Sequence, residues 1–600
     1  TTPTSIEESI NQSSIAFRKC RCHLSWITTM GFSLLRSLLL FVAWLHVLPV
    51  AYCIAWTTTT TAKVARASSA NVSRNGSSKI WGVIAARGGS YNSDAVKKQG
   101  CLVLMDVFCE FHGIYLTNLA REVYGVECVH VLSEYMADYF KYQQQQDDND
   151  ESNDTEASPR MPSSPEEAIE WRRDLVEEFM MSEHATSNNY KDIELKGLIC
   201  ESDPGLADAE RLSEWLNVTN HNGFNEARRN KFMTISTLAS KNIPTVRQKL
   251  CSTMNEAIEF ATNEFSSLSA NIVVVKPLRG CASDDVFLCN SLESVRSAYE
   301  TVKGSTVLGS PTKKHELVLV QEYAVGQEYA IDTVTKNGKL KIAAVWKYDK
   351  RPQPPTIEQA QLLEDIGTID GGASGDNDDG GKVDEKHRQV YYATRLYDDC
   401  DENGTEDTSD SLLPMIYQYL EDCLNALDVR WGITHSELII TPDGPRLIEV
   451  NCRQHNMNFV PLTDNAIGYN LFDMLLAAYF GDDDDKNDAI DIQRDARVDW
   501  DILPDYPSRR MNAAMVHLVN DKKGVLKRLN ESALYEIQDM ESVLNLEVFP
   551  EFLEPGVSII EPTVDIKTDA GWIQMVNPDR EIFERDYQRI MELMPTLFEV

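Results

Sequence analysis

The sequence predicts a multidomain protein that combines the α/β and α+β fold classes. Its 600 residues exceed what a single hydrophobic core usually organises, so several domains are expected. Between residues 79 and 216, short apolar runs alternate with helical patterns, as they do in parallel sheets. From residue 316 onwards, apolar runs joined by Asn-Gly and Asp-Gly predict antiparallel hairpins.

The first 75 residues predict a targeting leader. Arg36 precedes an apolar segment at 37–56 that ends in small residues, as in a signal peptide. The next stretch, 56–79, is rich in Ser and Thr and contains no acid, which is typical of plastid transit peptides. The combination resembles the bipartite leader of algae with secondary plastids and predicts a mature protein that starts near residue 75. The alternatives are the secretory pathway or a membrane anchor, because about 20 apolar residues can span a bilayer.

The region 76–220 predicts a parallel sheet of doubly wound topology. A strand at 79–90 leads into the turn at Gly88 and Gly89, a helix follows at 115–125 and a strand at 126–133. Residues 195–216 repeat the order of strand, turn and helix. The glycine pair does not form a dinucleotide-binding fingerprint, so no nucleotide site is predicted in this region.

Strand pairs dominate the pattern from residue 221 onwards. A basic helix and a short strand after Pro244 come first, and 271–289 then reads as strand, loop and strand. Residues 316–352 predict a strand meander that turns at 336–338. An amphipathic helix at 411–430 precedes a second hairpin at 433–453.

The return strand of this second hairpin carries polar side chains in alternation. Glu449, Asn451 and Arg453 are two residues apart, so all three leave the same face of the strand, whereas Ile448 and Val450 take the apolar face. A solvated sheet face would give a similar pattern. The residues around the strand therefore have to decide between a functional face and a solvated one.

The outgoing strand favours a metal site. If the turn is centred on Asp443, Glu437 lies directly opposite Glu449, and two carboxylates about 5 Å apart repel each other unless a cation lies between them. Asn451 adds an amide oxygen to the same face. Carboxylate and amide oxygens are the ligands that Mg²⁺ prefers, with phosphate oxygens completing its octahedron.

The charge of the chain comes largely from local acidic runs. The net charge is -36, and the runs lie at 143–167, 364–385, 398–410 and 481–488. Such runs cannot bury apolar surface, so they predict disordered surface insertions. The acidity argues against a nucleic-acid partner, since phosphate binding needs clustered Lys and Arg. The 13 cysteines include no Cys-x-x-Cys and no Cys/His cluster at zinc spacing, so neither a disulfide framework nor a zinc site is signalled.

Three segments in order resemble the ATP-grasp superfamily of carboxylate-amine ligases. They are "VVVKP" at 273–277, "VQEYAVGQEYAID" at 320–332 and "HSELIITPDGPRLIEVNCR" at 435–453. "VWKYDKRP" at 345–352 makes the chain most similar to the L-amino-acid ligase (dipeptide synthetase) and carnosine-synthase-like branch. The resemblance implies an ATP-grasp fold at 221–485, a Rossmann-like domain at 76–220 before it and an α+β cap at 486–600 after it.

The resemblance also implies a role for individual residues. Lys231 and Lys276 would reach the phosphates of ATP, because an ammonium group suits them as a point charge. Gln321, Glu322 and the backbone of Ala324 would form the adenine hinge. Glu328 would hold the ribose hydroxyls.

Further residues would bind metal and substrate. The metal ligands would be Glu437, Glu449 and Asn451, holding two Mg²⁺ ions, with Mn²⁺ as an alternative. Arg453 would clamp the substrate carboxylate or the acyl phosphate. His435 and His455 flank this strand pair; His435 is a catalytic candidate, although a lone histidine is more often structural.

Two segments depart from the family pattern. The phosphate-covering loop, "RGCASDD" at 279–285, keeps only Gly280, with Ala282 and Asp285 where glycine is common. Ser283 remains as a candidate phosphate donor. After Arg453 the chain reads "QHNMN" where glycines are frequent, so an altered acceptor pocket is expected.

The expected activity is ATP-dependent ligation of a small carboxylate, an amino acid or a similar acid, to an amine. The carboxylate would form an acyl phosphate, with release of ADP, and the amine would displace phosphate. A carboxylating enzyme that uses bicarbonate and a non-catalytic ATP-binding regulatory protein are the alternatives. The protein is expected to reach a membrane only through its leader, and a homodimer is a further option.

Overall fold

The computed structural model describes residues 99–107, 110–146, 160–181, 193–267, 272–280, 285–307, 313–352, 389–397, 412–481 and 498–600. All of them fall within the unit Ala70–Val600. The leader at 1–75, the strand at 79–90, the acidic runs at 364–385 and 398–410 and the candidate Ser283 lie outside the described residues. Targeting to a plastid therefore stays a prediction. Among the described helices, none is both long enough and apolar enough to cross a membrane.

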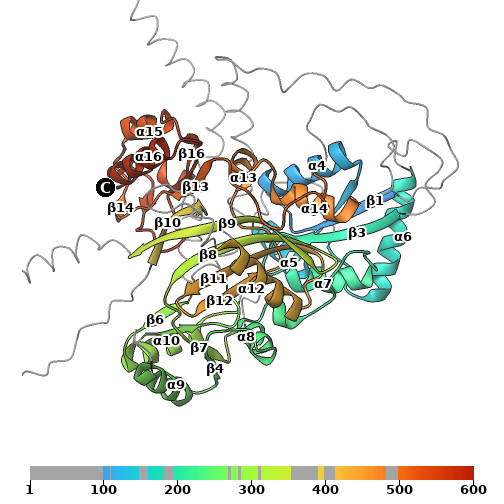
Figure 1. Ribbon diagram of the computed structural model, residues 1–600, viewed down its shortest axis with the longest axis horizontal. Helices are drawn as coiled ribbons and strands as arrows, with labels where there is room; N and C mark the ends of the chain where they lie inside the picture. Colours follow the sequence, from blue (N-terminus) through green and yellow to red (C-terminus); the bar gives the residue numbers. More distant parts are fainter. Residues whose placement is uncertain are drawn as a thin grey trace, which may run out of the picture. The chain divides into compact units, whose positions relative to one another are not determined.

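A parallel sheet forms the first domain, as the alternating pattern predicts (Figure 1). In the described part of this domain, three strands pair in the order β2-β1-β3, with β1 parallel to both neighbours. The helix predicted at 115–125 and the strand predicted at 126–133 are confirmed as α4 and β2. The elements are β1 (Gln99–Met105), η1 (Glu110–Ile114), α4 (Tyr115–Tyr124), β2 (Glu127–Val131), α5 (Glu134–Gln146), α6 (Pro165–Met181), β3 (Ile193–Cys200) and α7 (Leu206–Trp215).

The acidic insertion predicted at 143–167 is too wide at both ends. Helix α5 continues to Gln146. Arg160 forms a parallel bridge with Leu132, and Met161 is buried in the core of the first domain. Helix α6 begins at Pro165. The acidic composition suggested that the whole segment is disordered. One buried methionine and one bridge nevertheless fix its second end, and composition does not indicate such contacts.

A small antiparallel sheet with the order β4-β7-β5-β6 follows. Val273 and Val275 of β5 point into its core together with Val295 and Val302 of α10, while Lys276 ends the strand. The strands predicted after Pro244 and within 271–289 are confirmed as β4, β5 and β6. The elements are η2 (Glu226–Arg228), α8 (Lys231–Ser240), β4 (Gln248–Cys251), α9 (Met254–Ser267), β5 (Val273–Lys276), β6 (Phe287–Cys289), α10 (Leu292–Gly304) and β7 (Val318–Glu322).

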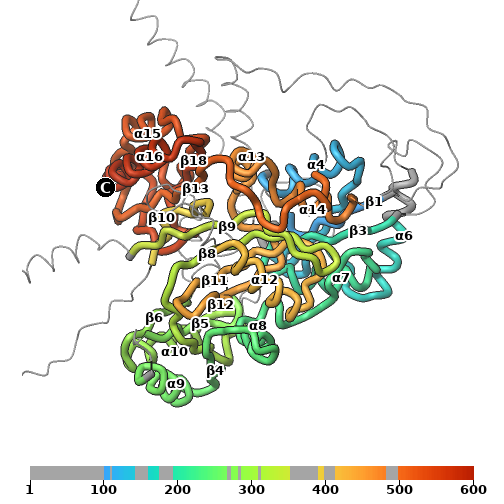
Figure 2. Tube along the Cα trace, viewed as in Figure 1, coloured from blue at the N-terminus to red at the C-terminus, as the bar shows by residue number. Residues whose placement is uncertain are grey.

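A larger sheet carries both predicted hairpins. Its order, over the described strands, is β12-β11-β8-β9-β10-β13-β18-β16, with every neighbouring pair antiparallel. The chain enters it from the small sheet through residues 323–326. Figure 2 shows the small sheet, labelled at β4, β5 and β6, and the large sheet as neighbouring parts of the trace. The elements are β8 (Gln327–Lys336), β9 (Lys339–Pro352), β10 (Gln389–Leu396), α12 (Leu413–Ala426), β11 (Gly432–Thr441), β12 (Gly444–Asn451), α13 (Val460–Ala466) and α14 (Leu471–Phe480).

The turn between β8 and β9 gives a testable effect on stability. Asn337 and Gly338 have φ of 49° and 84°, the left-handed pair that a two-residue hairpin turn requires. Replacing Gly338 by alanine should lower the free energy of unfolding by about 1–2 kcal/mol, since a Cβ disfavours that conformation although it meets no neighbour. Gly304→Ala is the control, because Gly304 ends α10 without a positive φ and alanine there should be neutral or stabilising. Equal denaturation midpoints for the two variants would contradict this prediction.

The hairpin of β11 and β12 contains a β-bulge beside Glu437. Thr441 pairs with Gly444 and Leu438 with Leu447, but Glu437 pairs with Glu449, so Ile448 is the extra residue. The predicted opposition of Glu437 and Glu449 is confirmed. The apolar face differs from the prediction: Leu447 and Val450 enter the core and Ile448 remains half-buried, because the bulge changes the alternation.

The C-terminal region extends the large sheet. Strands β13 and β18 continue it beyond β10, and β16 closes that edge. The boundary predicted at residue 486 therefore does not separate two sheets. The elements are β13 (Asn512–His517), β14 (Gly524–Val525), β15 (Arg528–Leu529), α15 (Glu531–Gln538), β16 (Val543–Val548), η4 (Pro550–Phe552), β17 (Ile559–Ile560), β18 (Gly571–Asn577), α16 (Arg580–Leu593), η5 (Met594–Thr596) and β19 (Phe598–Glu599).

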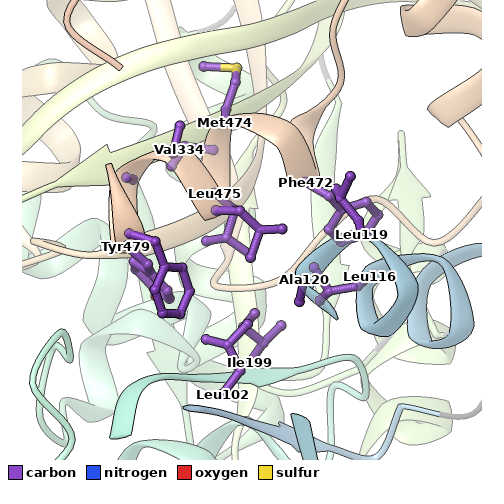
Figure 3. Packing of buried hydrophobic residues seen from close by; sticks show 14 of the residues in the cluster. Leu102, Leu116, Leu119, Ala120, Ile199, Val334, Phe472, Met474, Leu475 and Tyr479 are labelled. Atoms are coloured by element: carbon purple, nitrogen blue, oxygen red, sulfur yellow. The ribbon is translucent and has the colours of Figure 1, made fainter. Parts of the chain in front are cut away.

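Helix α14 joins the first domain to the large sheet. Its Leu475 is fully buried and packs in one cluster with Leu116 of α4, Ile199 of β3 and Val334 of β8 (Figure 3). Nearly the whole helix is apolar, as expected for an element with neighbours on several sides. This shared core packs the parallel sheet of the first domain against β8 and β11 of the large sheet.

Candidate active site

One face of the large sheet collects charged side chains from adjacent strands. In the register of β11, His435 lies opposite Asp332 of β8 on one side and opposite Asn451 of β12 on the other. Glu437, two residues further along β11, lies opposite Glu449. Residues directly opposite in a sheet share a face, so these side chains stand together on it.

The predicted metal ligands are brought together. Glu449 lies beside Lys231, with 2.7 Å between Lys231 Nζ and Glu449 Oε1. Glu437 accepts a hydrogen bond of 3.0 Å from the hydroxyl of Tyr348, and its Oε1 lies 3.6 Å from Nε2 of His435. Two opposed carboxylates with basic and hydroxyl donors around them form an oxygen-rich face that suits a hard divalent cation.

A lysine from β9, Lys350, adds a positive charge among the carboxylates of this face. Lys350 Nζ donates to Glu328 Oε2 at 2.6 Å, so the predicted ribose ligand already has a cationic partner. Burial raises the pKa of Glu328, and the charge of Lys350 opposes that rise. Burial would also raise the pKa of Glu437, but its hydrogen bond with His435 and the positive charges of His435 and Lys350 outweigh burial and lower it. Glu437 is thereby held as a carboxylate.

Lys276 reaches the same face from the small sheet. Its side chain is buried, and burial together with the neighbouring charge of Lys231 lowers its pKa to about 8. Glu449, Glu437 and Glu328 oppose that shift, which shows that the three carboxylates lie within electrostatic reach of the ammonium. Lys231 of α8 and Lys276 of β5, the two predicted phosphate-binding lysines, therefore both lie near carboxylates of this face.

The predicted hinge forms the link between the two sheets. The side chain of Gln321 is buried and donates to Gln248 Oε1 at 2.9 Å, and Glu322 is paired with Arg247. Both side chains thus hold the small sheet, and the backbone at 322–324 is the part that can meet an adenine ring. Gly326 is required just beyond it, because a Cβ there would lie 2.0 Å from the carbonyl oxygen of Ile440.

The phosphate-covering loop is described only at its ends. Asp285, which stands where glycine is common, has φ of 53°. Asp is one of the few side chains that tolerate this left-handed conformation, so the backbone there keeps a glycine-like geometry.

Arg453 is held by the first domain. Its Nε and Nη2 donate to the two carboxylate oxygens of Asp203 at 2.5 and 2.9 Å, and its Nη1 donates to the carbonyl oxygen of Gln454. Asp203 follows β3, at the carboxyl edge of the parallel sheet. The guanidinium predicted to clamp substrate is thereby fixed in orientation by a bidentate pair.

Sequence reasoning missed several residues of this face. Tyr348 and Lys350, together with Trp346, point to the face at every second position of β9, and Tyr391 of β10 lies under the ammonium of Lys350 at 4.3 Å. Their alternation within "VWKYDKRP" was a usable signal. Asp203 had none, because it lies 250 residues from Arg453.

Comparison with known proteins agrees with this geometry. Residues 269–363 match the model of the ATP-grasp domain. Dapdiamide A synthase from Enterobacter agglomerans is 23% identical over 264 residues, which are 43% of this chain and 50% of that protein, so the chain spans about half the length of this curated relative.

The fold resembles that of a solved L-amino acid ligase. An L-amino acid ligase from Bacillus licheniformis superposes with a TM-score of 0.51 at 15% identity, over 83% of this chain and 98% of that one. An N5-carboxyaminoimidazole synthase from Aspergillus clavatus gives 0.48 at 12% identity, over 83% and 99%. Residues 269–363 are therefore similar to the ATP-grasp domain, and the fold of the chain resembles that of the L-amino acid ligase.

Proposed function

We propose that the protein is an ATP- and Mg²⁺-dependent ligase that joins the carboxylate of an amino acid, or a similar small acid, to an amine. The observation that supports this most is the charged face of the large sheet, where Lys231 contacts Glu449 and Lys276 lies near Glu437 and Glu449. Such an arrangement of cations against carboxylates suits a polyphosphate bridged by a divalent metal. Dapdiamide A synthase and the L-amino acid ligase are the relatives that favour amino-acid substrates.

The reaction has two steps. An oxygen of the substrate carboxylate attacks the γ-phosphorus of ATP, the bond to the bridging oxygen breaks, and ADP leaves an acyl phosphate behind. The nitrogen of the amine then attacks the acyl carbon, phosphate leaves, and the nitrogen loses a proton to give the amide. Both steps need positioning and charge neutralisation rather than a covalent nucleophile.

The charged residues of this face have distinct roles in this scheme. Lys231 and Lys276 would bind the phosphate oxygens, and Arg453, oriented by Asp203, would hold the carboxylate or the acyl phosphate. The carboxylates of Glu437 and Glu449 and the amide oxygen of Asn451 would hold Mg²⁺, for which we propose two ions. When bound, Mg²⁺ would neutralise the charge that develops on the transferred group.

The test is the release of ADP and phosphate from ATP and Mg²⁺, with amino acids supplied singly and in pairs. Glu449→Gln should abolish amino-acid-dependent turnover. Glu259→Gln is the matched control. Like Glu449, Glu259 pairs with a lysine, here Lys249, but it is an exposed carboxylate on α9. ADP formation that requires particular amino acids and is lost only in Glu449→Gln would support the ligase and begin to identify its substrates.

Other outcomes of this assay lead to other functions. A signal that depends on bicarbonate would replace the amino-acid ligase with a carboxylating enzyme. Binding of ATP without turnover across the panel, together with normal binding by Glu449→Gln, would favour a regulatory ATP-binding protein.

Lys276 predicts a pH dependence of ATP binding. The pKa of about 8 in the ligand-free protein means that the ammonium loses its proton as the pH rises through 8, whereas bound phosphate raises that pKa. Affinity is therefore full below pH 8 and should fall above it by up to about tenfold per pH unit. Calorimetric titrations with ATP should show this slope in the wild type and none in Lys276→Met. The same slope in both proteins would assign the titration to another group.

A further inference from the structure

A second group of ligating side chains lies beside the carboxylates of the charged face. Asp332 of β8, His435 of β11 and His455, which follows β12, bring one ligand atom each within 4.8 Å of one another. His435 Nδ1 lies 3.0 Å from Asp332 Oδ1, and His455 Nδ1 lies 3.6 Å from Asp332 Oδ2. We propose that these three residues bind a divalent transition-metal ion of the zinc class, at a site separate from the Mg²⁺ ligands.

The donor set selects the class of ion. Two imidazole nitrogens and one carboxylate oxygen suit Zn²⁺, Co²⁺ or Fe²⁺, whereas Mg²⁺ requires oxygen ligands. Three protein ligands also leave at least one position for water, as in zinc sites with two histidines and one carboxylate. The proposed ion therefore differs in chemistry from the one that Glu437 and Glu449 would hold, although Glu437 adjoins both sites.

The surroundings of the cluster match those of a metal centre. Trp346 Nε1 donates to Asp332 Oδ2 at 2.8 Å, which fixes the carboxylate. The second ring nitrogen of His435, Nε2, faces Glu437 Oε1 at 3.6 Å. Metal-bound histidines commonly direct their other N–H at a carboxylate, and bound carboxylates are themselves hydrogen-bonded. Two of the three proposed ligands thus already have the outer partners that orient a ligand.

A small cavity and unsatisfied polar atoms adjoin the cluster. The cavity, of about 30 Å³, is lined by two of the three proposed ligands, Asp332 and His455, and by Gln454, His112 and Phe459, but not by His435. This volume admits one or two water molecules. Within the described chain, His455 Nδ1 and Gln454 Oε1 are buried without a hydrogen-bond partner. An ion would use the first of these atoms, and a water molecule bound to that ion would donate to the second.

A purely structural role is the competing interpretation. The ring of His455 stacks between those of His435, at 4.1 Å, and Phe459, at 4.2 Å between centroids. Stacking alone would explain the position of the ring, but it would leave the buried Nδ1 with only the Asp332 carboxylate at 3.6 Å, beyond hydrogen-bond distance, which is costly.

Metal binding distinguishes the two interpretations without any activity assay. The full chain, stripped with EDTA and returned to buffer with excess Mg²⁺, is titrated with Zn²⁺ against a chromophoric chelator. The expected result is one Zn²⁺ per chain that Mg²⁺ does not displace. His455→Ala should weaken this binding by at least about tenfold, and Trp346→Phe, which removes only the N–H to Asp332, by about tenfold or more.

His517→Gln is the matched control. His517 is also buried and pairs with a carboxylate, Asp569, at 2.6 Å, but this pair lacks a second histidine. Its replacement should leave Zn²⁺ binding unchanged. Equal retention of Zn²⁺ by the wild type and His455→Ala would overturn the proposal, as would the absence of tight Zn²⁺ from the wild type.

Co²⁺ provides a readout that does not depend on any variant folding. In the wild type, Co²⁺ should give the visible ligand-field bands of a four- or five-coordinate site with nitrogen ligands. Zn²⁺ should abolish these bands and Mg²⁺ should not. A spectrum of hexa-aquo Co²⁺ alone would overturn the proposal even if the ligase activity is confirmed.

Discussion

Replacing Glu437 by glutamine should lower kcat for ATP-dependent turnover by a factor on the order of 100 to 1,000, with a smaller effect on the affinity for ATP. The change keeps the shape of the side chain and the hydrogen bond from Tyr348, but it removes the charge that His435 and Lys350 stabilise. Groups that compensate charge in the transition state contribute effects of this size. Steady-state kinetics at saturating Mg²⁺ and direct binding of ATP provide the two quantities.

Glu421→Gln is the control for this prediction. Glu421 also accepts a hydrogen bond from a tyrosine, Tyr417, at 3.3 Å, but it lies on helix α12 and not on the charged face of the large sheet. Its replacement should leave kcat within a factor of about two, as expected for a substitution outside the site. If the two variants lose activity equally, Glu437 has no special part in turnover.

Replacing Leu475 by alanine should lower the free energy of unfolding by about 2–5 kcal/mol. Leu475 is fully buried where α4, β1, β3 and β8 meet, so the truncation removes apolar contacts and leaves a cavity between sheets that cannot easily close. Chemical denaturation followed by tryptophan fluorescence measures the loss.

Leu544→Ala in β16 separates burial from residue type. Leu544 is 44% exposed, and its truncation should change stability by no more than about 0.5 kcal/mol. A similar loss in both variants would mean that the cluster around Leu475 is less tightly packed than it is described. A loss of ATP turnover in Leu475→Ala at temperatures where the protein remains folded would show that the core also positions Asp203 against Arg453.

Local pattern was sufficient to predict the hairpins and the charges that they carry. Turn residues such as Asn337 and Gly338 determine where two strands reverse, and alternation determines which side chains share a face. The opposition of Glu437 and Glu449 could therefore be predicted from one hairpin, whereas the role of Lys276 was implied only by the family resemblance. The leader and Ser283 remain predictions, since they lie outside the described residues.

Contacts between distant segments could not be predicted in the same way. Asp332 and His435 are 103 residues apart, and Arg453 is 250 residues from Asp203. Neither pair has a spacing rule, because the first depends on strand order within the sheet and the second on packing of α14 between domains. The absence of a zinc-type spacing in the sequence was correct as an observation, yet the fold assembles two histidines and an aspartate.

The bulge at Ile448 makes one strand serve two different counts. Leu447 and Val450 are three residues apart and both enter the core. Glu449 and Asn451, on the charged face, are two residues apart, as in a regular strand. Deleting Ile448 would move either the core residues or the residues of the charged face out of position. The length of this short segment is therefore constrained more strongly than the identity of residue 448.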